Sequence, residues 1–251
     1  MTPELPKYFF KVHSDLPREG PGDSESTRKA YLMLRDLPKN PRILDVGCGP
    51  GMQTIELAKL SNGTIEALDN HQPFLEQLMN KAKEEGVAKK IRIVKGNMFK
   101  LNYRNSSFDV IWSEGAIFII GFEKGISEWK RLLTAKGYIA VSEVSWLKPN
   151  PPEGLRAYWE KYYPAIKTIQ QNLQIIRKVG YQIINYFVLP PKSWWENYYA
   201  PIESKLPSLR SKYADNPEAS SFLDEAQLEI DMFRKYSEYY GYVFYIMQTT
   251  E

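Results

Sequence analysis

Residues 43–51 read Ile-Leu-Asp-Val-Gly-Cys-Gly-Pro-Gly, an apolar run that ends in three glycines spaced two apart. The run predicts a buried strand that leads through a tight turn into a helix. Glycine adopts positive φ and has no Cβ, so a ligand can lie directly against the backbone of such a turn. The stretch therefore predicts a cofactor site.

The spacing of these glycines separates two kinds of cofactor loop. Gly47, Gly49 and Gly51 form G-x-G-x-G, whereas the dinucleotide fingerprint is G-x-G-x-x-G, and Met52 stands where its last glycine would be. Asp45 precedes the loop by two residues, which the dinucleotide pattern does not require. Because a glycine-rich turn can also be a turn and nothing more, the prediction needs further parts of the site.

A second part follows about twenty residues later. Residues 64–69 read Thr-Ile-Glu-Ala-Leu-Asp, which predicts a second strand that ends in an acid. In doubly wound nucleotide-binding folds this position holds the ribose hydroxyls. Asp69 or Asn70 could instead cap the helix that begins near Pro73. The two roles are compatible, and we favour ribose binding.

Composition limits the other functions. The 251 residues suit one α/β domain, and 33 basic against 30 acidic residues leave a net charge of only +3, which does not suggest an extended phosphate-binding face. One cysteine excludes an internal disulfide, and two histidines without a Cys/His cluster predict no metal site. The start lacks a signal-peptide pattern, and no apolar run approaches 18 residues, so we expect a cytoplasmic protein without a membrane span.

Between residues 42 and 144, short apolar runs alternate with one-sided helical patterns, which predicts βαβ units and a parallel sheet. We expect strands at 42–46, 64–69, 91–95, 109–113 and 137–144. Ahead of them, a helix is expected over 24–37 with Asp23 or Ser24 as its cap. The preceding loop at 18–22 is interpreted either as a connector or as a lid.

After residue 144 the alternation loosens. Residues 149–179 and 190–240 look mostly helical, while 181–189 and 241–249 alternate as strands. Bulky aromatic residues concentrate in the helical stretches, which predicts a helical cap over the carboxyl ends of the strands. We therefore expect a single domain over 1–251, of Rossmann-like doubly wound α/β class. Its cofactor-binding core would cover 25–148, with cap insertions at 149–179 and 190–240.

Two further loops would join the same edge of the sheet. Gly96-Asn97-Met98 follows the third strand, and Ser113-Glu114-Gly115-Ala116 follows the fourth. With these parts together, the chain resembles the class I S-adenosylmethionine-dependent methyltransferases. Residues 45–51 resemble their first motif and Asp69 their ribose acid, while 108–112 and 132–138 resemble their fourth strand and the turn into their fifth. Within the class, the chain looks closest to the ubiquinone/menaquinone-biosynthesis-like small-molecule branch.

The resemblance implies a cofactor, S-adenosyl-L-methionine with S-adenosyl-L-homocysteine as product, and a seven-stranded sheet whose last strand is antiparallel. It also implies a role for each matching position. The glycine loop would approach the methionine portion, and Asp45 would hold the turn or, through water, the cofactor's ammonium. Asp69 would accept hydrogen bonds from the ribose hydroxyls, and Asn97 with Met98 would contact the adenine. The cofactor-binding residues expected on this basis are Asp45, Gly47, Cys48, Gly49, Gly51, Asp69, Asn70, Asn97, Met98 and Glu114.

The resemblance implies a methyltransferase that acts on a small, partly apolar or aromatic metabolite by in-line transfer in a water-poor pocket. Glu114 is the candidate catalytic base, or it orients the cofactor or caps a helix. An RNA or protein methyltransferase, a non-catalytic sensor of the cofactor and a nicotinamide dehydrogenase are the alternatives. Residues 113–116 lack the Asn/Asp-Pro-Pro-aromatic pattern of base-modifying enzymes, so we expect no nucleic-acid partner. A homodimer is left open.

Overall fold

The computed structural model describes residues 8–13 and 15–250. Its strands are β1 (Arg42–Val46), β2 (Thr64–Asp69), β3 (Ile91–Lys95), β4 (Phe108–Ser113), β5 (Leu133–Trp146), β6 (Lys167–Thr168), β7 (Tyr181–Val188) and β8 (Tyr240–Thr249). Its α-helices are α1 (Phe9–His13), α2 (Ser24–Tyr31), α3 (Met52–Leu60), α4 (Gln72–Glu84), α5 (Phe122–Trp129), α6 (Glu153–Tyr162), α7 (Ile169–Lys178), α8 (Lys192–Trp194), α9 (Ala200–Lys212) and α10 (Pro217–Tyr236). Shorter turns are η1 (Ala88–Lys90), η2 (Ile117–Ile119), η3 (Lys130–Leu132) and the π-helical η4 (Trp195–Tyr199).

The main path of the sheet runs β3-β2-β1-β4-β5-β8-β7, and the two-residue β6 pairs with β5 beside this path. Strands β1 to β5 pair in parallel, whereas β8 pairs antiparallel with both β5 and β7. The order reverses direction between β1 and β4, the switch point where open α/β sheets bind ligands. The predicted Rossmann-like sheet with an antiparallel last strand is confirmed.

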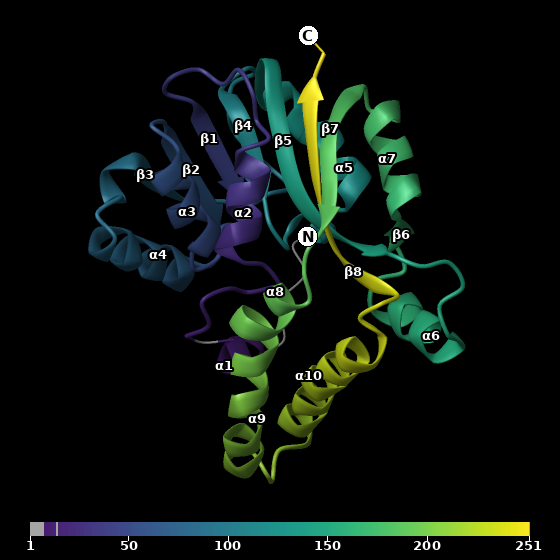
Figure 1. Ribbon diagram of the computed structural model, residues 1–251. Coiled ribbons are helices and arrows are strands. Elements are labelled where there is room, and N and C mark those ends of the chain that lie inside the picture. Colours follow the sequence, from purple (N-terminus) through teal and green to yellow (C-terminus); the bar gives the residue numbers. More distant parts are fainter. Residues whose placement is uncertain (1–7, 14, 251) are drawn as a thin grey trace.

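Helices cover both faces of the sheet (Figure 1). The side chains of each central strand alternate between two apolar clusters, one on each face. On one face, Ile43 of β1 packs in a cluster with residues of α3 and α4 such as Leu57 and Leu75. On the other face, Leu44 packs with residues of α5 and α7 such as Ile126. Both faces are thus buried, which fits the continuous apolar runs of the central strands.

The predicted bounds of β1, β2 and β3 agree with the structure, and those of β4, β7 and β8 differ by one residue. Two elements, α2 and β5, differ by more. The helix expected over 24–37 ends at Tyr31, because the amides of Met33 and Leu34 then bond to carbonyls only three residues back, as in a turn. Asp23 is its cap and accepts a hydrogen bond from the Ser26 amide at 2.7 Å. Strand β5 runs beyond the expected 137–144 because β8 pairs with it as far as Trp146.

The helices α8 to α10 extend past the carboxyl ends of the parallel strands, with α6 beside them (Figure 1). Trp194 and Phe233 stack there with ring centroids 4.3 Å apart, and both belong to the same apolar cluster as the sheet residue Ile43. The second part of the expected 149–179 insertion is not part of this cap, because α7 packs against β7 and α5. In the first part, α6 and Tyr163 face the cavity at the carboxyl ends of the strands.

Candidate functional site

A cavity of about 530 Å³ lies at the carboxyl ends of the strands, between the glycine loop and the helical cap. It brings together most of the residues predicted from the sequence: Gly47, Cys48, Gly49, Asp69, Asn70, Asn97, Met98 and Glu114. Asp45 and Gly51 are not part of its lining. Asp45 instead contacts Gln53 and Thr54 of α3, and Gly51 lies against Leu78 of α4.

The glycine loop has the backbone shape that its sequence requires. Gly47, Gly49 and Gly51 all have positive φ, at +74°, +53° and +87°. A Cβ on Gly51 would lie 2.1 Å from Leu78 Cδ1, and one on Gly47 would lie 2.5 Å from the Cβ of Ala116. At Gly49 the nearest atom would be 3.5 Å away. Two of the glycines are therefore required by close packing, while Gly49 leaves its backbone open to the cavity.

Asp69 ties the end of β2 to this loop. Its Oδ2 accepts a hydrogen bond from the Gly49 amide at 2.9 Å, and its Oδ1 accepts one from the His71 amide at 2.9 Å. Burial raises the pKa of Asp69, and the hydrogen bonds from these backbone amides lower it. Because a carboxylate has about four acceptor sites, both oxygens can accept further hydrogen bonds from a ligand.

Asp45 lies beneath the loop and is fully buried. Its Oδ2 accepts hydrogen bonds from Thr54 Oγ1 at 2.6 Å and from Gln53 Nε2 at 3.3 Å. Among the described residues, its Oδ1 has no partner. Burial raises the pKa of Asp45 to about 7. Asp45 thus fixes the start of α3 through Oδ2 and keeps one oxygen available.

The loop after β3 also reaches the cavity. The Gly96 amide donates to the Asp69 carbonyl at 2.9 Å, which joins this loop to the end of β2. Asn97 Oδ1 accepts a hydrogen bond from the Phe99 amide at 2.9 Å and so closes its own turn. Met98 lines the cavity directly. The apolar Met98 and the amide of Asn97 suit a flat heterocycle better than a charged group.

Glu114 is buried at the centre of a polar network. Its Oε1 accepts hydrogen bonds from Thr27 Oγ1 at 2.7 Å and from Trp112 Nε1 at 2.8 Å. Its Oε2 forms an ion pair with Arg18 Nη2 at 2.7 Å. Three donors therefore hold the carboxylate in place, and it fastens the N-terminal segment to the loop after β4.

Arg18 is a site residue that the sequence reading missed. Its side chain is only 4% exposed, and its Nη1 is buried without a partner among the described residues while the residue lines the cavity. Gly22 makes room for it, because a Cβ there would lie 2.4 Å from Arg18 Cζ. The segment 18–22, which was interpreted as a connector or a lid, is therefore part of the wall. An arginine in a polar loop gives no local signal of burial.

Aromatic rings form the cap side of the cavity. The π-helical turn η4 places both Tyr198 and Tyr199 on it, and such turns are frequent at functional sites. A carboxyl group, Glu229 of α10, lies among them and accepts a hydrogen bond from the Tyr199 hydroxyl at 3.0 Å. The other aromatic residues of this wall are Tyr158, Trp159, Tyr162, Tyr163, Trp194 and Tyr242. The aromatic residues of the cap are predicted from the sequence, but Glu229 is not. On a long helix, a glutamate at this position has the pattern of a surface residue.

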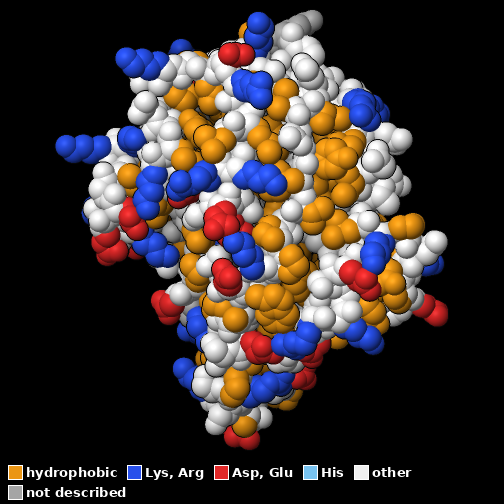
Figure 2. Space-filling view, in the orientation of Figure 1, with side chains coloured by type: hydrophobic (Ala, Val, Ile, Leu, Met, Phe, Trp, Pro, Cys, Tyr) orange, Lys and Arg blue, Asp and Glu red, His pale blue; other side chains and the backbone are white. Residues whose placement is uncertain are grey.

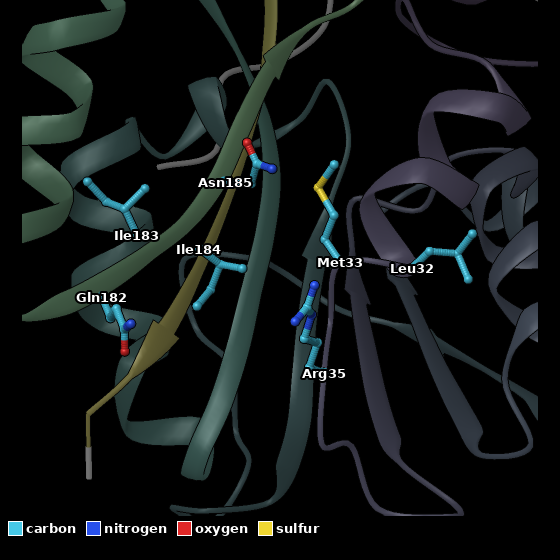
Figure 3. A pocket seen from close by; sticks show the side chains of 7 residues that line it. All are labelled: Leu32, Met33, Arg35, Gln182, Ile183, Ile184 and Asn185. Carbon is cyan, nitrogen blue, oxygen red and sulfur yellow. The ribbon is translucent and has the colours of Figure 1, made fainter.

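A second hollow, of about 340 Å³, lies between the segment after α2 and β7. Figure 3 shows its lining, with Leu32, Met33 and Arg35 on one side and residues of β7 such as Ile184 on the other. None of the residues predicted to bind a cofactor lines it. The larger cavity is therefore the candidate functional site.

Other features of the described residues narrow the chemistry of the site. The described residues contain no group of three or more His, Cys, Asp or Glu side chains placed to hold a metal ion. Burial raises the pKa of the Cys48 thiol well above its usual value, so the thiol is held in its protonated form. Over residues 8–13 and 15–250, no helix is long and apolar enough to cross a membrane.

Comparisons with known proteins agree with this geometry. Residues 43–137 match the family model described as "Methyltransferase domain". The chain is 24% identical to the sterol 24-C-methyltransferase of Neurospora crassa over 82% of this chain and 61% of that protein. It is 27% identical to the sarcosine/dimethylglycine N-methyltransferase of Aphanothece halophytica over 47% of this chain and 44% of that protein. The chain thus spans less than two thirds of the length of these relatives.

A solved structure resembles almost the whole chain. The S-adenosylmethionine-dependent methyltransferase from Geobacter sulfurreducens, in complex with S-adenosyl-L-homocysteine, has a TM-score of 0.82 and 22% identity. The match covers 98% of this chain and 99% of that one, which establishes the shared fold. Residues 43–137 thus carry a methyltransferase domain, and the chain as a whole has the fold of this solved methyltransferase.

Proposed function

We propose that the protein transfers a methyl group from S-adenosyl-L-methionine to a small molecule held in the aromatic cavity. The observation that carries this proposal is one cavity that joins the glycine loop and Asp69 to the aromatic cap. Its volume of about 530 Å³ falls within the ~300–1,000 Å³ typical of small-molecule sites. A donor and an acceptor can therefore meet in one enclosed space.

The residues present fit the cofactor. Asp69 is placed to accept hydrogen bonds from ribose hydroxyls, and Asn97 with Met98 offers a surface for adenine. Two buried atoms without partners among the described residues belong to groups of opposite charge: Arg18 Nη1 lies in the cavity lining and suits a carboxylate, and Asp45 Oδ1 lies beneath the loop and suits an ammonium group through water. These assignments are proposals for the donor side of the cavity.

The bound cofactor would supply an electrophilic methyl group on a sulfonium sulfur. The chain's own residues would align donor and acceptor and exclude water. Alignment can lower the activation free energy by ~7–11 kcal/mol in favourable cases. The aromatic rings of the cap exclude water and stabilise positive charge by about 0.5–2 kcal/mol per cation–π contact. For Glu114 we propose a positioning role, because its two oxygens already accept three hydrogen bonds, one of them from its ion-pair partner Arg18.

Two alternatives differ from this proposal in the partner or in turnover. An RNA or protein substrate is less well supported, because acidic and basic side chains are interspersed on the face shown in Figure 2. A sensor that binds the cofactor without turnover would use the same donor side. A cytoplasmic location stays a prediction of the sequence, which also leaves a homodimer open.

Calorimetry with S-adenosyl-L-homocysteine tests the cofactor, with NAD as the competing ligand. We expect binding of the first and none of the second; tighter binding of NAD would overturn the proposal. Incubating metabolite extracts with methyl-labelled S-adenosylmethionine then separates an enzyme from a sensor. Label incorporated into a small molecule supports the enzyme, whereas cofactor binding without any incorporation supports the sensor.

A further inference from the structure

The charge of the cavity lining is unequal. Among the described lining residues, Arg18 is the single basic one, while Glu19, Asp69, Glu114 and Glu229 are acidic. Arg18 is already paired with Glu114 at 2.7 Å. Asp69 lies on the donor side, so the acidic groups left beside the cap are Glu19 and Glu229. A lining of this kind favours a ligand that carries positive charge.

Glu229 is surrounded by tyrosines. Tyr199 donates a hydrogen bond to its Oε1, and the charge of Glu229 adds to burial in raising the pKa of nearby tyrosine hydroxyls. The tyrosines affected in this way are Tyr158, Tyr198, Tyr199, Tyr240 and Tyr242. Five rings from α6, η4 and β8 therefore lie within the field of one carboxyl group, although they are far apart in the sequence.

The groups around the two acids do not cancel this preference. His13 Nδ1 lies 3.0 Å from Glu19 Oε2. Burial raises the pKa of Glu19, while the His13 hydrogen bond and the charges of His13 and Lys205 lower it. Burial raises the pKa of Glu229, while the Tyr199 hydrogen bond and the charge of His13 lower it. An entering cation would favour the ionised form of Glu229, because an opposite charge nearby stabilises a carboxylate. Glu229 is thus the cap-side acid with no basic side chain within ion-pair distance among the described residues.

The ring arrangement adds a second source of attraction. Trp194 and Tyr199 lie with centroids 5.7 Å apart, and Tyr198 and Tyr199 lie 5.1 Å apart. Aromatic faces attract ammonium groups, and the attraction grows where water is excluded. A carboxylate acceptor would be repelled by this wall, and a neutral hydroxyl would gain little from its charge.

We propose that the methyl acceptor is an amine, which enters as its ammonium ion and is held by Glu229 and the tyrosine rings around it. The inference rests on the proposed methyl transfer and names the substrate class for the same cavity. Glu229 takes one proton from the ammonium nitrogen and becomes a neutral carboxyl, which frees the nitrogen lone pair. The nitrogen then forms the bond to the methyl carbon, while the electron pair of the broken carbon–sulfur bond stays on sulfur.

Binding of a cation that cannot be methylated tests the recognition step. Choline and its neutral isostere 3,3-dimethylbutan-1-ol are titrated into the protein saturated with S-adenosyl-L-homocysteine, followed by tryptophan fluorescence. We expect choline to bind at least tenfold more tightly than the isostere. In Glu229→Gln, which keeps an oxygen for the Tyr199 hydroxyl, the preference should fall to threefold or less. Glu218→Gln removes the same charge from the exposed start of α10 and should change nothing.

The outcomes separate the two proposals. If S-adenosyl-L-homocysteine does not bind, the proposed function is wrong. If it binds to the wild type and to Glu229→Gln with equal affinity, both are folded, and equal binding of choline and the isostere then overturns the amine inference alone. A labelled-methyl screen of arylalkylamines, which are protonated at neutral pH, against the matching alcohols gives a second readout. Label in the amines supports the inference, and label in the alcohols instead contradicts it.

Discussion

Replacing Gly51 by alanine should destabilise the protein by an amount that the structure sets. Gly51 has φ +87°, a left-handed conformation that costs a non-glycine residue about 1–2 kcal/mol. The new Cβ would lie 2.1 Å from Leu78 Cδ1, and both residues are buried. Overpacking of a well-packed core adds about 1–3 kcal/mol. The free energy of unfolding should therefore fall by roughly 2–5 kcal/mol.

Gly86→Ala is the matched control. Gly86 has φ +71°, yet no atom lies within 4 Å of the position that its Cβ would take. Gly86→Ala therefore has only the conformational cost, and the difference in unfolding free energy between the two variants isolates the clash with Leu78. Urea unfolding followed by circular dichroism gives both free energies. In a Leu78→Ala background the two nearest clashing atoms, Cδ1 and Cγ, are absent and only the Cβ of residue 78 stays, at 2.9 Å from the new Cβ. The cost of Gly51→Ala should therefore fall towards that of Gly86→Ala.

The clash is refuted if Gly51→Ala and Gly86→Ala lower the free energy of unfolding equally in the wild-type background. An equal cost of Gly51→Ala with and without the Leu78 side chain would show that α4 moves away freely. A second measurement connects this packing to function, because a loop displaced from Leu78 no longer presents the Gly49 backbone in the same place. We therefore expect Gly51→Ala, and not Gly86→Ala, to weaken S-adenosyl-L-homocysteine binding.

Three other changes give distinct signatures. Asp69→Ala should weaken S-adenosyl-L-homocysteine binding at least tenfold in calorimetry, because a hydrogen bond to a charged group contributes ~1.5–3 kcal/mol. An unchanged affinity would show that the ribose lies elsewhere. Arg18→Lys should weaken the binding of S-adenosyl-L-homocysteine severalfold. It should leave the binding of 5′-methylthioadenosine unchanged, because this ligand lacks the amino-acid portion. Equal losses of affinity for both ligands would contradict the assignment of Arg18 to the methionine end. Burial raises the pKa of Glu143 from 4.5 to about 8 while Tyr163 donates to its Oε1 at 2.7 Å. The folded state therefore keeps a proton that the unfolded state releases, so this contribution to stability is present below pH 4.5 and is lost as the pH rises to about 8. Glu143→Gln should gain stability over the wild type between pH 5 and pH 8 in urea unfolding, and a difference independent of pH would refute the shift.

Local sequence patterns predicted the cofactor half of the molecule well. The runs at 42–46, 64–69 and 91–95 gave the bounds of β1 to β3, because each is a short apolar segment closed by turn residues. The glycine spacing predicted a turn with positive φ at Gly47, Gly49 and Gly51, as the structure has it. Positions that follow neighbouring parallel strands must meet at one sheet edge, so the convergence of Asp69, Asn97 and Glu114 could also be predicted.

The cap half depends on contacts that no local pattern encodes. Arg18 and Glu114 are 96 residues apart, and Asp23 and Ser193 are 170 apart, yet each pair is in contact. Burial of these groups follows from how α8 to α10 fold back over the strands. The same folding places Glu229, which a helical wheel alone would leave in solvent, against the Tyr199 hydroxyl.

The sequence by itself thus determined the Rossmann-like order of strands and the methyl-donor loop, because both arise from neighbouring residues whose spacing fixes the backbone. Only the tertiary structure decided that Arg18 forms part of the wall, that Glu114 is engaged by three donors, and that a carboxyl group lies among the tyrosines of the cap. These features depend on which distant segments exclude water from one another. The physical reason is that desolvation and pairing of a charged side chain are properties of its surroundings in space.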